Sequence, residues 1–84
     1  MSLFWPDGEL IAVRKDSSGA PGAFTWYGRS HEVRGVAKRW RVDHGWWCKR
    51  VWREYYKLHT DTGLLVILYM DLLTGQWFLQ RLYD

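Results

Sequence analysis

Clusters of turn-forming residues divide this chain at intervals of about ten to eighteen residues, and no other feature constrains its fold as strongly. The clusters combine Gly with Pro, Asp, Ser or Thr and occupy residues 6–8, 16–22, 27–30, 43–45, 61–63 and 73–75. The segments between them are of strand length and rich in Val, Ile, Trp, Tyr and Phe, which are enriched in β-strands. Short strands at such spacing predict an all-β barrel or sandwich.

We expect six strands, at residues 9–15, 22–27, 31–42, 51–60, 64–71 and 76–83. Most connections are short enough for hairpins, so the strands should form an antiparallel meander that makes a small barrel or a strongly bent sheet. The exceptions are the first connection and a loop expected at 43–50.

The apolar run from Leu64 to Met70 leaves a helix over 64–73 as a competing interpretation, which would make the fold α+β. Residues 61–63, Asp-Thr-Gly, are more typical of a hairpin turn than of a helix N-cap, which favours the strand. In the third segment the hydrophobic alternation changes phase, because Val33 is at an odd position and Trp40 at an even one. Gly35 lies at the changeover, which predicts a β-bulge or a sharp bend.

At 84 residues the chain has room for one hydrophobic core, so we expect a single domain over 1–84 with a disordered end at about 1–7. Aromatic residues make up 18% of the chain and supply much of the core volume. The residues expected in the core are Phe24, Trp26, Val36, Trp40, Tyr56, Leu58, Val66, Leu68, Phe78 and Leu82.

Cys48 is the only cysteine, which excludes an intrachain disulfide and a multi-cysteine metal cluster and fits a reducing compartment. The amino end has no basic region of a signal peptide, and the longest apolar run is too short for a membrane span. We therefore expect a cytoplasmic domain without membrane association.

No residue constellation dictates a reaction, and we expect a protein that is not an enzyme and needs no cofactor or metal. Cys48 and His44 are four residues apart, a spacing that brings two side chains together only on a helix, and the intervening Gly-Trp-Trp is a poor helical turn. The histidines lack zinc spacing, the acidic residues are scattered and mostly lie in turns, and no phosphate-binding glycine loop occurs.

Basic and aromatic residues are concentrated together between Arg34 and Lys57. This stretch holds eight basic and two acidic residues, a net charge of +6 in a chain whose total is +3, and four of the seven Trp. In 51–59 the even positions are mainly apolar and should pack, while the odd positions are basic and aromatic and should face solvent or a ligand. The expected binding residues are Arg39, Arg41, Trp46, Trp47, Arg50, Arg53, Tyr55 and Lys57.

Three interpretations of this stretch remain open. Arg and Lys neutralise phosphates and aromatic rings stack on unpaired bases, so the stretch fits a module that binds single-stranded nucleic acid. The same patch, or an exposed strand edge, fits a module that docks a repair or replication protein or a second copy of the chain. The third interpretation is structural, because Trp and Tyr in a small β domain are mostly core residues on which Arg often stacks.

Several short motifs resemble a small bacterial domain of unknown function. They are residues 39–43 (RWRVD), 46–47 (WW), 53–56 (REYY), 68–71 (LYMD), 77–79 (WFL) and 82–84 (LYD). The resemblance covers about residues 22–84. Such domains occur alone and, in a related form, at the carboxyl end of ImuB-type proteins, the inactive relatives of Y-family polymerases. The resemblance implies a context of DNA-damage response or translesion synthesis, and no nucleotidyl-transfer residue is carried over.

Overall fold

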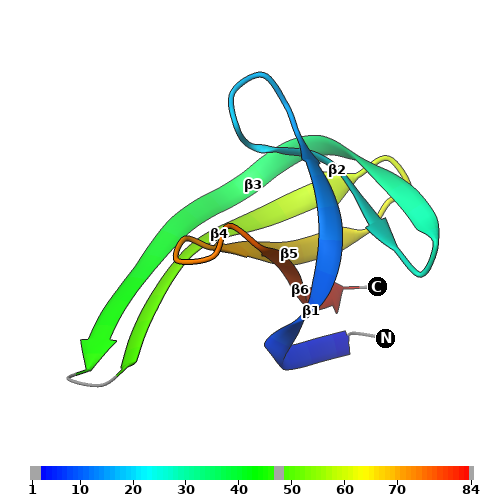
Figure 1. Cartoon of the computed structure of the whole chain (residues 1–84). Coiled ribbons are helices and arrows are strands. Elements are labelled where there is room, and N and C mark those ends of the chain that lie inside the picture. Colours follow the sequence, from blue (N-terminus) through cyan, green and yellow to red (C-terminus); the bar gives the residue numbers. More distant parts are fainter. Residues whose placement is uncertain (1–2, 47–48, 84) are drawn as a thin grey trace.

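The computed structural model describes residues 3–46 and 49–83, and every regular element within them is a β-strand (Figure 1). The strands are β1 (Leu3–Lys15), β2 (Pro21–Trp26), β3 (Arg29–Trp46), β4 (Lys49–Thr60), β5 (Leu65–Asp71) and β6 (Trp77–Tyr83). The predicted all-β class is confirmed, and the helix considered over 64–73 is wrong because this segment contains strand β5. None of the described residues forms a helix long and apolar enough to cross a membrane.

Each strand pairs antiparallel with the next along the chain, and β6 pairs back with β1, so the sheet closes into a ring. The meander predicted from the turn spacing is therefore confirmed. The bulge predicted at Gly35 is also present, because the β3–β4 register shifts between Val33 and Gly35 and again between Val36 and Lys38. In this region β3 bends over the top of the ring (Figure 1).

The strands extend beyond the predicted boundaries in two main places. β1 begins at Leu3 instead of residue 9, and its first residues lie beside β6 with Leu3 opposite Leu82. The predicted loop at 43–50 is wrong, because β3 and β4 remain paired as far as Trp46 and Lys49. Continued pairing with β4 overrides the local turn tendency of residues 43–45, and the connection at 47–48 lies outside the described residues.

The hydrophobic core fills the ring. Its buried members are Phe24, Tyr56, Leu58, Val66, Leu68, Trp77, Leu79 and Leu82. Six of the predicted core residues are among them, and Trp26 packs against the cluster while partly buried. Trp40 and Phe78 are half-buried instead, on the outside of the ring. Val36 is 46% exposed, and its assignment to the core is wrong because it lies beyond the end of the β2–β3 ladder.

The expected core position of Phe78 is wrong for a separate reason, which lies in the alternation of β6. Leu79 and Leu82 are both buried although they are three residues apart, because the β5–β6 register shifts and inserts an extra residue between them. A bulge of this kind moves later side chains to the other face without any signal in the hydrophobic pattern.

β3 and β4 project beyond the ring as a two-stranded arm, at the lower left of Figure 1. β2 pairs with β3 only as far as Glu32, and β5 pairs with β4 only from Arg53 onward. We call residues 38–46 of β3 and 49–57 of β4 the arm; its base, at 53–57 of β4, also pairs with β5. The arm contains all the residues predicted to bind, apart from Trp47.

Candidate functional site

The register of β3 and β4 divides the predicted site between two opposite faces of the arm. Arg39 lies opposite Tyr56, and Trp40 lies opposite Tyr55. Because residues directly opposite each other share a face of a sheet, odd positions of β3 go with even positions of β4. The inner face, which continues the ring interior, carries Arg39, Arg41, Asp43, Arg50, Trp52, Glu54 and Tyr56. The outer face carries Lys38, Trp40, Val42, Arg53, Tyr55 and Lys57. The expected single surface joining Arg39 and Arg41 to Arg53, Tyr55 and Lys57 is therefore wrong.

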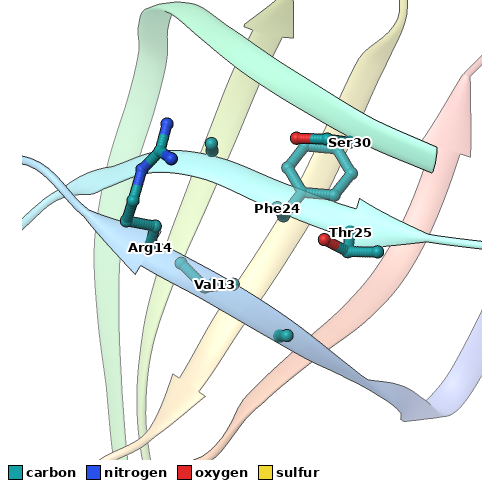
Figure 2. Close-up of a pocket in the computed structure, with 7 residues that line it drawn as sticks. Val13, Arg14, Phe24, Thr25 and Ser30 are labelled. Atoms are coloured by element: carbon teal, nitrogen blue, oxygen red, sulfur yellow. The ribbon is translucent and has the colours of Figure 1, made fainter. Parts of the chain in front are cut away.

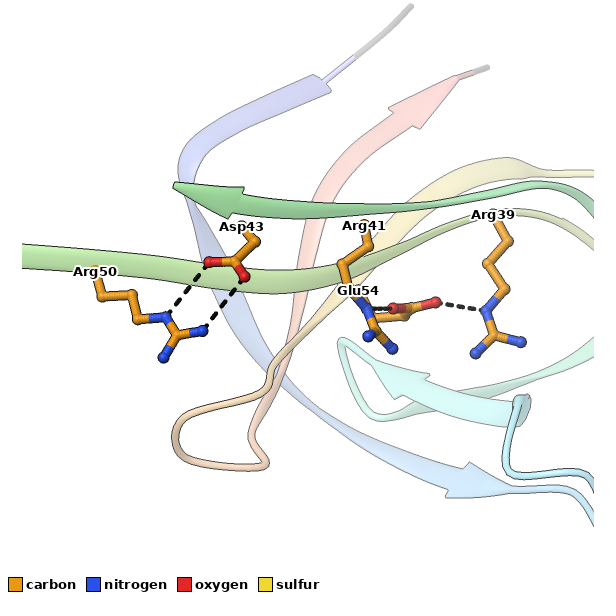
Figure 3. Close-up of polar contacts among 5 residues, drawn as sticks. All are labelled: Arg39, Arg41, Asp43, Arg50 and Glu54. Carbon is orange, nitrogen blue, oxygen red and sulfur yellow. Dashed lines mark hydrogen bonds and ion pairs between the residues drawn. The ribbon is translucent and has the colours of Figure 1, made fainter. Parts of the chain in front are cut away.

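On the inner face, the carboxylate of Glu54 is held between two arginines (Figure 3). The Nε groups of Arg39 and Arg41 donate hydrogen bonds of 2.5 and 2.6 Å to its two oxygens. Glu54 is only 5% exposed. Its burial alone would raise its pKa, but the hydrogen bonds from Arg41 and Arg39 outweigh that effect and lower the pKa below its ordinary value. Glu54 therefore neutralises part of the predicted basic patch.

Arg50 is also paired on the inner face. It donates hydrogen bonds of 3.4 and 3.3 Å to the two carboxylate oxygens of Asp43, as Figure 3 shows, and its guanidinium lies 4.7 Å from the ring centroid of Trp52. With two carboxylates against three guanidinium groups, the inner face has a net charge of only +1.

The outer face carries a row of four aromatic rings that crosses strands β3 to β6. Trp40, Tyr55, Tyr69 and Phe78 lie opposite one another in successive ladders. Neighbouring ring centroids are 5.1, 5.2 and 5.0 Å apart. Tyr55 is only 8% exposed, so the expected exposed ring at this position is wrong. Its neighbours in the row cover it, although its strand position faces outward.

The amino-terminal part of β1 closes over one end of this aromatic row. The Tyr69 hydroxyl donates a 2.8 Å hydrogen bond to the carbonyl oxygen of Asp7. Gly8 has a φ of +77°, and a Cβ there would lie 2.7 Å from the Cβ of Phe78. The β1–β6 register shifts between Phe4 and Glu9, so residues 5–8 form the bulge that makes this close approach.

Four basic side chains surround the aromatic row, each beside a ring. Charged groups of Lys38 and Arg53 lie 5.4 and 4.4 Å from the ring centroids of Trp40 and Tyr69. Lys57 and Arg81 lie 5.4 and 5.5 Å from the centroid of Tyr83. These are distances at which the negative face of a ring attracts a cation.

The cations of the outer face are not held in salt bridges as those of the inner face are. Within residues 3–46 and 49–83, the basic residues in salt bridges are Arg14, Arg39, Arg41 and Arg50. None of the four side chains around the aromatic row forms one. Burial alone would lower the pKa of Arg53, but its hydrogen bond to the Tyr55 hydroxyl and the electrostatic effect of Tyr69, Tyr55 and Asp71 raise the pKa instead. We call Lys38, Arg53, Lys57 and Arg81 the outer cations.

Sequence reasoning identified Arg53 and Lys57 in this group but missed Lys38 and Arg81. Lys38 belonged to the counted basic stretch, yet the bulges of β3 concealed which face it occupies. Arg81 lies outside that stretch. Its alternation with the aromatic Tyr83 was the sequence signal that could have identified it. Trp46 lies opposite Lys49 at the end of β3, and its side chain, like Trp47 and Cys48, lies outside what the structure describes.

The hollow drawn in Figure 2 does not form an alternative site. The hollow in Figure 2 has a volume of about 200 Å³ and lies across β1, β2 and β3, with Arg14 as its charged lining residue. Arg14 is itself paired with Glu32. Within residues 3–46 and 49–83, no group of three His, Cys, Asp or Glu side chains is arranged to hold a metal ion.

Most of the chain matches a known protein family. A sequence profile described as DUF6504, a domain of unknown function, matches residues 7–84. No curated protein and no solved structure is significantly similar to the chain. The predicted resemblance to a domain of unknown function is confirmed.

Proposed function

The chain belongs to the DUF6504 family, a domain of unknown function, and from the geometry of its surface we propose that it is a non-catalytic module that binds single-stranded nucleic acid. The observation that carries this proposal is the set of outer cations, which lie on one sheet face and form no salt bridge with a described carboxylate; Asp71, opposite Arg53, is the acidic residue of this face. An array of cations of this kind attracts a polyanion, and each phosphate contact releases counterions.

The aromatic row has a supporting part in this mechanism. Trp40 and Tyr69 of the row, together with Tyr83 beside it, hold the outer cations above the sheet, which reduces the side-chain entropy lost when a phosphate binds. Tyr55 is too buried to stack on a base. Bases stack instead on rings at the margin of the aromatic row, such as the half-buried Trp40.

The shape of the face favours single strands. The outer cations and the aromatic row spread over four adjacent strands, β3 to β6, whereas only a helix or a two-stranded ribbon enters the major groove of a duplex. A flexible strand can follow this broad face with its phosphates on the cations and its bases toward the marginal rings. The resemblance to ImuB-type proteins suggests a DNA-damage response or translesion synthesis as the setting of this activity.

Fluorescence anisotropy of labelled oligo-dT tests the proposal, with a duplex of the same length as the comparison. We expect binding at low salt that weakens steeply as salt rises, and weaker binding of the duplex. No binding at low salt, binding insensitive to salt, or a preference for the duplex would each contradict the proposal.

A further inference from the structure

β3 has a free edge along the arm. Its residues from Val33 onward pair with β4 on one side, while on the other side the β2 ladder ends at Glu32. Residues 34, 36–39, 41 and 43–45 of β3 are exposed. In a strand paired on one side only, alternate residues direct their N–H and C=O groups outward, where another extended chain can accept and donate hydrogen bonds.

Only part of this edge is regular enough to serve as a template. The first part carries the two register shifts around Gly35 and Val36, and bulges of this kind block pairing by twisting an edge. From Lys38 to Trp46 the β3–β4 register runs without a shift. Residues 38–45 therefore present a straight edge about 25 Å long, at roughly 3.3 Å per residue.

The charge of the arm selects the kind of chain that fits this edge. Within 38–45 and 50–57 there are six basic and two acidic residues, a net charge of +4. A second copy would bring its own arm with the same charge, and like charges opposite each other in a ladder destabilise it. An added acidic strand would place its side chains beside Lys38 on the outer face and beside Arg39 and Arg41 on the inner face.

We propose that residues 38–45 of β3 bind an acidic, extended peptide segment by β-strand addition. The backbone groups of the free edge supply hydrogen bonds, and the basic side chains on both faces of the arm supply specificity. This site shares Lys38 with the proposed nucleic-acid surface, but it binds through the main-chain edge of β3 and not through the exposed face of β3 to β6.

Hydrogen exchange of the whole chain, measured by NMR, tests the proposal with three eight-residue capped peptides. The first alternates Glu and Thr. The second has the same side chains, with backbone N-methyl groups that remove N–H donors from both edges of the peptide strand. The third alternates Lys and Thr. With the first peptide, we expect protection of alternate amides in 38–45 and at least tenfold tighter binding than with either of the others.

Other outcomes would overturn the proposal. Equal binding of the N-methylated peptide would show attraction by charge alone, without strand addition. Protection that rises with protein concentration before peptide is added would assign the edge to a second copy. Absence of binding at millimolar peptide, or protection of amides outside 38–45 alone, would show that this edge is not the binding site. Oligo-dT binding without protection of these amides would leave the nucleic-acid proposal standing, so the two proposals fail separately.

Discussion

Trp40 and Tyr55 lie opposite each other across the β3–β4 ladder, with ring planes only 6° apart and centroids 5.1 Å apart. Tyr55 also contacts Tyr69 on its other side and accepts a hydrogen bond from Arg53. This relationship makes Tyr55 a packing residue, although alternation along β4 places it on the face away from the core.

We predict that Tyr55→Ala lowers the free energy of unfolding by about 3–5 kcal/mol, the range for truncation of a buried aromatic ring. Tyr55→Phe keeps the ring and loses only the hydrogen bond with Arg53, so we expect a loss of about 0.5–1.5 kcal/mol. Urea denaturation followed by tryptophan fluorescence measures both. A Tyr55→Ala variant as stable as the wild type would show that the aromatic row does not stabilise the fold.

Gly8→Ala should destabilise the protein more than a glycine substitution in an open turn. The added Cβ meets Phe78 and the Tyr69 ring, and the φ of +77° disfavours alanine. We expect a loss of about 2–5 kcal/mol, combining roughly 1–2 for the backbone and 1–3 for overpacking. Gly63→Ala is the matched control, since its φ is +83° and nothing lies within 4 Å of its Cβ position. Equal melting temperatures for the two variants would contradict the close packing of the β1 bulge.

Glu54 should make stability depend on pH in the acid range. Its pKa in the folded protein is lowered, so the unfolded chain binds a proton at a higher pH, near the ordinary pKa of 4.5. The stabilisation is therefore present above that pH and is lost as the pH falls through the folded pKa. The test is a comparison of urea midpoints for wild type and Glu54→Gln between pH 6 and pH 3. The wild type should fall more steeply, and parallel curves would contradict the role of the Arg39 and Arg41 hydrogen bonds.

The fold was predictable from the chain because its signals are local. Turn residues at 27–30 and 61–63 and the strand composition between the turns predict the meander, and the glycine at position 35 predicts the bulge of β3. The arm was not predictable in the same way. Residues 43–45 have the composition of a turn, and only their pairing with β4 holds them in a strand.

The candidate site was predictable in composition but not in geometry. The sequence shows that arginine and aromatic residues gather in one stretch, yet the face of each depends on the β3–β4 register. That register depends on two bulges, and a shift of one residue moves every later side chain to the opposite face. Pairing of Glu54 with Arg39 and Arg41 follows from the same register and has no signal in sequence spacing.

The nucleic-acid proposal is tested most directly by removing charge from the outer face. Lys38 and Lys57 lie opposite each other in the ladder, and Lys15 and Arg29, exposed on β1 and β3, give a control with the same change in net charge.

The decisive measurement is the salt dependence of oligo-dT affinity for the wild type, for Lys38→Gln with Lys57→Gln, and for Lys15→Gln with Arg29→Gln. The first double variant should bind at least tenfold more weakly at low salt. The slope of log K against log salt should decrease by about 1.4, because each phosphate contact with a single strand contributes about 0.7. The control should keep the slope of the wild type. Equal slopes for all three proteins, or an equal decrease in both variants, would contradict the proposal that the outer cations contact phosphates.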